Sequence, residues 1–212
     1  MMLRLGVLDL DGTLTNTAIL HLKAWRDALT DLGLLDEVRS ISVEYLLGRR
    51  AIDIATALVG AGPQAWRLVR LKTMYYLDLL SNGLDPFPCA MELLDETHEL
   101  GMMAAVVTSS SRSSALAVLK ATRLLEKVDY VVAGDDVEKG KPDPLPIRLA
   151  LDRFNVMPKQ AYGIGDTIYD VEAYRAAGLG LVMSLNPING AIHVKDLCEA
   201  INVIKRTASL AL

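Results

Sequence analysis

The sequence predicts an α/β fold in which a doubly wound parallel sheet carries a small all-helical insertion after its first strand. Three observations predict this fold. The apolar run at residues 5–8 leads straight into acidic and turn-forming residues, as a strand does where it leaves a sheet. From residue 84 onward, short apolar runs alternate with helical patterns, which is typical of βαβ units. Between residues 16 and 83 only helical patterns occur, so this segment interrupts the alternation.

The insertion, residues 16–83, is predicted to contain three helical regions. Asn16 is placed to cap the first helix, which ends at Gly33. Segments near 42–59 and 64–80 also place apolar residues at helical spacing.

The remaining residues, 1–15 and 84–212, are predicted to form the α/β core. The links between the core and the insertion are short and rich in turn formers, so they are predicted to act as hinges. The core is expected to hold helices at 89–100, 112–121, 145–154 and 168–177, and strands at 102–107, 130–133, 162–164 and 179–183.

Composition restricts the classes of partner. A chain of 212 residues with 51% hydrophobic content can bury a substantial core. The formal net charge is −4 and no Lys/Arg cluster forms a basic stripe, so nucleic-acid binding is not expected. The apolar runs are shorter than the roughly 18 residues that suggest a membrane span. We therefore expect a cytoplasmic monomer or homodimer with no membrane partner.

The cysteines and histidines show no metal-ligand spacing. Cys89 and Cys198 each stand alone in the sequence and are interpreted as small buried hydrophobic residues. The three histidines, His21, His98 and His193, are scattered as well. A zinc site is therefore not expected.

Two acids follow the first strand. Because side chains alternate along a strand, Asp9 and Asp11 are expected to point to the same side of it. Two neighbouring anions repel, and Mg²⁺, which prefers carboxylate oxygens and phosphate, is the natural compensating ion. Gly12 supplies a turn where the backbone can approach a ligand. Taken alone, the pattern agrees equally well with acids that cap a helix or shape a turn.

Three later loops also follow core strands, where ligands bind in a doubly wound sheet. Thr108 and Ser109 open a loop whose hydroxyl and backbone N–H groups suit a phosphate oxygen, although ordinary helix capping explains them too. Lys141 lies just before a proline, where its ammonium can neutralise a phosphoryl group or simply face solvent. Asp166 and Asp170 follow the next strand and can complete a metal site or cap a helix.

These four loops, in this order, resemble the haloacid dehalogenase-like (HAD) hydrolase superfamily over nearly the whole chain. The matching segments are Asp9-Leu-Asp-Gly-Thr-Leu-Thr, the strand that ends at Thr108, Lys141-Pro-Asp-Pro and Gly-Asp166-Thr-Ile-Tyr-Asp170. The helical insertion resembles the cap of the subfamily that includes phosphoglycolate phosphatases, sugar phosphatases and β-phosphoglucomutases. The resemblance implies a Rossmann-like core with residues 16–83 as the cap domain.

The resemblance also implies a mechanism. Asp9 would attack phosphorus and form an aspartyl-phosphate, and Asp11 would be the general acid and base. Mg²⁺ would bind Asp9, the backbone carbonyl of Asp11 and Asp166, with Asp170 in support. Thr108 and Lys141 would hold the phosphoryl oxygens. The acid at position 11 favours a phosphoester over a carbon–halogen substrate, because only the former needs its leaving oxygen protonated.

The implied reaction is Mg²⁺-dependent hydrolysis of a small phosphorylated metabolite, similar to phosphoglycolate or a sugar phosphate. Residues of the cap and the loops are expected to bind this substrate: Gly12, Thr13, His21, Arg49, Arg50, Ser109 and Arg112. His21 is equally open to a packing role at the hinge, and for Trp25 packing is the favoured role.

Two alternatives to hydrolysis stay open. A β-phosphoglucomutase-like mutase is one, because His21 and Trp25 resemble the mutase cap entrance. The mutase arginine, however, is expected three residues past the cap glycine, whereas Arg49 and Arg50 follow Gly48 directly. The other alternative is a non-catalytic protein that uses the metal and phosphate pocket for binding or regulation.

Overall fold

Six parallel strands form one sheet in the computed structural model, which describes residues 2–38, 43–81 and 83–209. The α/β fold is therefore confirmed. The strand order is β3-β2-β1-β4-β5-β6, so β2 and β3 are added on one side of β1 and β4 to β6 on the other, and the strand order reverses at the centre of the sheet. The strands are β1 (Leu5–Leu8), β2 (Met103–Val107), β3 (Tyr130–Val132), β4 (Ala161–Gly165), β5 (Leu181–Ser184) and β6 (Ile192–His193).

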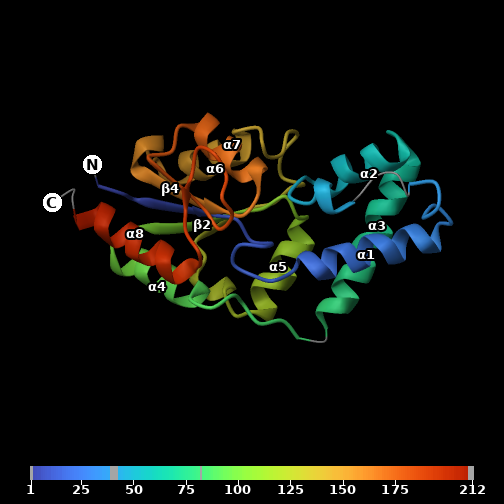
Figure 1. The fold of residues 1–212 in the computed structure, drawn as a ribbon, viewed down its shortest axis with the longest axis horizontal. Coiled ribbons are helices and arrows are strands. Elements are labelled where there is room, and N and C mark those ends of the chain that lie inside the picture. Colours follow the sequence, from blue (N-terminus) through green and yellow to red (C-terminus); the bar gives the residue numbers. More distant parts are fainter. Residues whose placement is uncertain (1, 39–42, 82, 210–212) are drawn as a thin grey trace.

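Strand β1 lies between β2 and β4, and all four of its residues are buried. Side chains alternate across it: Val7 joins the apolar cluster on one face of the sheet and Leu8 the cluster on the other. Figure 1 shows α6 and α7 on one face and α4 and α8 on the other. The core helices are α4 (Ala90–Glu99), α5 (Arg112–Ala121), α6 (Leu145–Phe154), α7 (Ile168–Ala177) and α8 (Leu197–Ser209).

Three further helices lie beyond one end of the sheet (Figure 1). They are α1 (Ala18–Asp31), α2 (Ala51–Val59) and α3 (Pro63–Leu80), and they share an apolar cluster that contains Trp25 and Leu68. Helix α3 also packs against α5 of the core. We refer to residues 16–83 as the cap; its boundaries stay a prediction.

Two details of the predicted cap are wrong. The region near 42–59 is not one helix: a 3-10 turn (Val43–Leu46) and α2 are separated by a turn in which Gly48 has a φ of +92°. Residue 42 itself lies outside the described residues. Asn16 does not cap α1. Thr17 holds the N-cap position and makes no side-chain capping bond, because its hydroxyl donates to Asp11 instead, at 2.6 Å.

The sequence interpretation ended at the strand near 179–183 and missed β6 and α8. Helix α8 buries Leu197, Ala200 and Ile204 at helical spacing on one face, which packs against α4. No helix among the described residues is both long and apolar enough to span a bilayer.

The interpretation of the two cysteines is also wrong, because Cys89 and Cys198 form a disulfide. Cys89 precedes α4 and Cys198 lies in α8, and the packing of these helices brings the two Cα atoms to 5.3 Å. The residues are 109 positions apart, so no local spacing in the sequence indicates the pair.

Cys198→Ser is expected to lower the free energy of unfolding of the oxidised protein by about 2–4 kcal/mol, because the disulfide restricts the unfolded chain. Urea unfolding with and without reductant measures this. The reductant should shift the midpoint of the wild type and leave that of the variant unchanged. Equal midpoints for the oxidised wild type and the variant would contradict the stabilising role.

Candidate active site

Asp9 stands at the carboxyl end of β1. Its backbone N–H donates to Ile164 O at 3.0 Å, which holds it beside the end of β4. The residue is only 5% exposed, and its carboxylate accepts a hydrogen bond from Lys141 Nζ at 2.6 Å. The Thr13 hydroxyl lies 3.2 Å from the other carboxylate oxygen. Asp9 is therefore held in one orientation inside the pocket.

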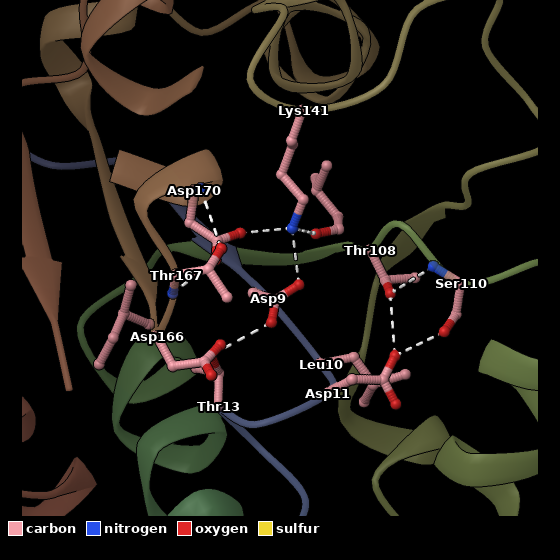
Figure 2. Close-up of polar contacts among 12 residues, drawn as sticks. Asp9, Leu10, Asp11, Thr13, Thr108, Ser110, Lys141, Asp166, Thr167 and Asp170 are labelled. Carbon is pink, nitrogen blue, oxygen red and sulfur yellow. Dashed lines mark hydrogen bonds and ion pairs between the residues drawn. The ribbon is translucent and has the colours of Figure 1, made fainter. Parts of the chain in front are cut away.

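Lys141 reaches the same place from the loop that follows β3. Its buried ammonium donates to Asp9, to Asp170 at 2.5 Å and to Val107 O at 3.1 Å, so all three of its protons have acceptors (Figure 2). Burial lowers the pKa of Lys141, but the charges of Asp170 and Asp9 more than offset burial and hold that pKa above its ordinary value. Lys141 is thus a fixed positive charge.

Asp9, Asp166 and Asp170 form an acidic cluster in which one oxygen of each lies within 4.8 Å of the others. Burial and repulsion from Asp170 raise the pKa of Asp9 well above its ordinary value and that of Asp166 to about 7. A Cβ at Gly12 would lie 2.3 Å from an Asp166 oxygen, so only glycine leaves room here. Three hard oxygen donors whose repulsion Lys141 offsets only in part fit a divalent cation.

Asp11 has a separate set of partners. Its carboxylate accepts hydrogen bonds from Thr17 at 2.6 Å and from Ser110 at 2.7 Å, and His21 Nε2 lies at 3.0 Å. Thr108 is a weaker partner at 3.2 Å (Figure 2). Burial raises the pKa of Asp11, but His21 and these hydrogen bonds outweigh burial and hold the pKa below its ordinary value.

Two of the side chains around Asp11 extend the site into α3 of the cap. Lys72 Nζ lies 2.7 Å from His21 Nδ1, and the His21 ring stacks on Tyr76 with centroids 4.1 Å apart. An ammonium only donates, so Nδ1 accepts from Lys72, and Nε2 carries the proton that His21 donates to Asp11. Burial and the charge of Lys72 lower the pKa of His21, which agrees with this neutral form.

The loop after β2 supplies hydroxyl groups. Ser111 caps α5 by accepting a hydrogen bond from the backbone N–H of Ser114. Helix capping, the alternative role predicted for this loop, is therefore performed by Ser111. Thr108 and Ser109 instead line the pocket with the acids. The buried Ser109 hydroxyl has no hydrogen-bond partner within the described part of the chain. It is therefore available to a ligand.

Several of these groups line one pocket, whereas Lys141 and Asp170 are not among the residues that line it. Asp9, Asp11 and Asp166 line it from the core, and His21, Arg49 and Lys72 line it from the cap. The rest of the cap side is mainly apolar and includes Trp25, Leu47, Ala51 and Ile54. Within the described residues, the Arg49 side chain has no hydrogen-bonding or ionic partner.

The other two predicted substrate-binding arginines lie elsewhere. Arg50 pairs with Asp53 and donates to Val137 O at 2.7 Å. Arg112 pairs with Asp136 and donates to Val131 O. Neither guanidinium lines the pocket described above.

Sequence reasoning missed Thr17, Lys72, Tyr76 and Ser110 as residues of the site. One signal was present: Lys72 stands among the buried positions Leu68, Tyr76 and Leu80 at four-residue spacing, where a lone lysine needs a polar partner. The contacts of Thr17 and Ser110 with Asp11 join residues 6 and 99 positions apart, and no sequence pattern indicates them.

The chain is similar to known proteins over most of its length. Residues 7–183 match the family model "Haloacid dehalogenase-like hydrolase". A phosphoglycolate phosphatase of Nitrosospira multiformis is 32% identical over 92% of this chain and 89% of its own. The fructose-1-phosphate phosphatase YqaB of Escherichia coli is 32% identical over 83% and 93%. The solved β-phosphoglucomutase of Clostridium difficile has a TM-score of 0.83, with 99% and 100% coverage, at 19% identity, and so shares the fold.

Lys72 gives a test of the cap side of the site. Burial lowers its pKa from 10.5 to about 8, so the unfolded chain binds more protons than the folded one between these values. The free energy of unfolding should therefore rise by about 2 kcal/mol between about pH 8 and pH 10. Lys72→Met should lose this rise, and Lys23→Met, at an exposed lysine, should keep it. Urea unfolding at both pH values measures this. If the free energy of unfolding depends on pH in the same way for the wild type and for Lys72→Met, the lowered pKa of a buried Lys72 is refuted.

Proposed function

Because the chain belongs to the haloacid dehalogenase-like hydrolase family, it is a phosphoric monoester hydrolase, and we propose that it is a Mg²⁺-dependent phosphatase of small phosphorylated metabolites. One observation carries the proposal. Asp9 and Asp11 line the same pocket in opposite electrostatic settings, one among acids beside Lys141 and the other among hydrogen-bond donors. Two carboxylates in different environments suit two different roles.

In the proposed first step, an oxygen of Asp9 attacks phosphorus and the bond from phosphorus to the leaving oxygen breaks. This gives an aspartyl-phosphate. The hydrogen bond from Lys141 fixes the carboxylate that attacks. Thr108 and Ser109, which line the pocket, are proposed to bind the phosphoryl oxygens. Lys141 is proposed to offset the negative charge of the phosphoryl group from its place against Asp9, and Gly12 and Thr13 form the turn that follows Asp9 and Asp11.

Asp11 is proposed to move the protons. Its hydrogen bonds favour the ionised form, which the second step needs, because a base must then take a proton from the water that attacks the aspartyl-phosphate. The first step needs the protonated form, which delivers a proton to the leaving oxygen. A substrate phosphate that enters beside Asp11 raises the pKa of Asp11 by like-charge repulsion and so favours protonation before the reaction.

The acidic cluster is proposed to hold Mg²⁺ through Asp9, Asp166 and Asp170, together with the backbone carbonyl of Asp11. When bound, Mg²⁺ neutralises charge on the phosphoryl oxygens and on the attacking carboxylate. Asp170 also accepts hydrogen bonds from Lys141 and from Thr167, which keep its carboxylate in place beside the other two acids.

Substrate choice is proposed to lie with Arg49 and the mainly apolar cap wall around it. Arg49 lines the pocket without a side-chain partner among the described residues, and a guanidinium there would favour a carboxylate or a hydroxyl at the far end of a short substrate, as in phosphoglycolate or a sugar phosphate. Two of the curated relatives act, by name, on such compounds. We also propose that the protein works in the cytoplasm as a monomer or homodimer, where Cys89 and Cys198 would be kept reduced.

Hydrolysis is preferred to the alternatives. The likeness to a β-phosphoglucomutase is a likeness of fold, and the relatives with more than 30% identity include phosphatases. A binding protein without turnover would not need both Asp9 and Asp11, and both acids line the pocket.

Asp9→Asn is expected to reduce turnover at least on the order of 10³-fold, because the amide cannot form the covalent intermediate. The assay is phosphate release from a panel of phosphorylated metabolites and p-nitrophenyl phosphate, with Mg²⁺ or with EDTA. The control Asp152→Asn alters an exposed carboxylate on α6 and should keep full activity. Activity that survives in Asp9→Asn with the fold intact, or full activity in EDTA, would refute the mechanism.

Arg49→Met is expected to raise KM for phosphoglycolate or the best sugar phosphate about 10- to 100-fold, as for loss of a hydrogen bond to a charged group. KM for p-nitrophenyl phosphate, which has no anion at its far end, should change about twofold or less. Arg67→Met removes an exposed arginine from α3 and serves as the control. Equal changes for both substrates would exclude Arg49 as the specificity residue.

A further inference from the structure

Arg50 belongs to the cap but is bound to the core. It is the N-cap residue of α2, and its guanidinium makes two bonds of 2.8 Å to the two oxygens of Asp53. The remaining nitrogen donates to Val137 O at 2.7 Å. The guanidinium is planar, so its two bonds to Asp53 fix its orientation and direct the third nitrogen at the core.

Two glycines of the core leave room for the Arg50 stem. A Cβ built on Gly140 would lie 2.6 Å from Cγ and 2.7 Å from Cδ of Arg50, and its three nearest heavy atoms all belong to Arg50. A Cβ on Gly134 would lie 3.3 Å from Cγ of Arg50. The arginine stem is therefore packed directly against the backbone of this loop.

The loop that Arg50 covers leads to the reacting groups. Gly140 immediately precedes Lys141, which holds Asp9. The backbone N–H of Gly134 donates to Ser110 O at 2.7 Å, beside Ser109. Any movement of Arg50 away from the two glycines frees space next to both phosphate-binding loops.

The cap segment that ends at Arg50 touches the core at a second place. A Cβ on Gly48 would lie 2.9 Å from Thr167, the N-cap residue of α7, and 3.0 Å from Tyr169 in the first turn of that helix. Arg49 stands between these two contacts, faces the pocket and has no partner within the described residues.

We propose that Arg50 is a positioning residue. Its bonds to Asp53 and to Val137 O, which we call the latch, hold the cap against the loop of Lys141 and thereby couple cap closure to the placement of Lys141 and Arg49. The proposal rests on the phosphatase function and assigns Arg50 a role other than substrate binding. If Arg50 bound the substrate, its substitution would remove a contact from the pocket. If it positions the loop, its substitution changes the placement of Lys141 and leaves the residues that line the pocket in place.

The test is a double-mutant cycle of Arg50→Ala and Gly140→Ala. Each single variant should lower kcat for p-nitrophenyl phosphate about tenfold with KM changed about twofold or less, since the latch is lost and the pocket keeps its ligands. Arg50→Ala should also speed hydrogen exchange of residues 134–141 about tenfold. The double variant should be no worse than Arg50→Ala, because the added methyl group then has no arginine to displace. Arg67→Ala is the control.

The latch would be overturned if the kcat of the double variant fell by the product of the two single-variant factors. It would also be overturned if Arg50→Ala raised KM and left hydrogen exchange unchanged. Hydrogen exchange needs no turnover, so it tests the latch even if no phosphoester is hydrolysed. If the wild type has no activity but Arg50→Ala still speeds hydrogen exchange of residues 134–141, the proposed function alone is refuted. An active wild type whose exchange is unaffected by Arg50→Ala would refute the latch alone.

Discussion

The ion pairs of Lys141 are the interaction on which the site depends. Asp9 and Asp170 are buried at one edge of the sheet, and two buried anions without compensation would cost several kcal/mol each. One ammonium joins both, which leaves a net negative cluster once Asp166 is counted. A single positive charge is enough to let the acids be buried together, and the remaining negative charge favours a divalent cation. The same lysine thus allows the acids to be buried and keeps them together at the proposed metal site.

The two proposed catalytic acids depend on different parts of the chain. Asp9 is held by core residues, through β1 and Lys141, whereas Asp11 depends largely on the cap side, where Thr17 and His21 contact it. Tyr76 of α3 adds a third contact, at 3.3 Å. If the cap moves, the contacts of Asp11 with Thr17 and His21 change directly, whereas Asp9 is affected only through the contact of Arg50 with the loop of Lys141. In the proposed mechanism, proton transfer is therefore the step that depends most directly on cap position.

The sequence predicts the fold well because periodic apolar patterns are local. It also predicts that Asp9, Lys141 and Asp166 meet at one edge of the sheet, because each lies in a loop that follows a core strand. What it does not predict depends on helix packing. The disulfide needs α4 beside α8, and the contact of Lys72 with His21 needs α3 beside α1. Neither pair is close in the sequence, so periodicity carries no information about it.

Arg49 and Arg50 show the same limit at its smallest scale. They are adjacent and chemically identical, and only the backbone separates their roles: Arg50 takes the extended N-cap conformation, with φ −61° and ψ 146°, that begins α2. The side chain is then directed to Asp53 and to the core loop, while the preceding side chain lines the pocket. If Arg49 selects the substrate and Arg50 holds the cap, as proposed, a change of substrate can arise at position 49 while the contact of Arg50 with the core is kept, because the two functions belong to different residues.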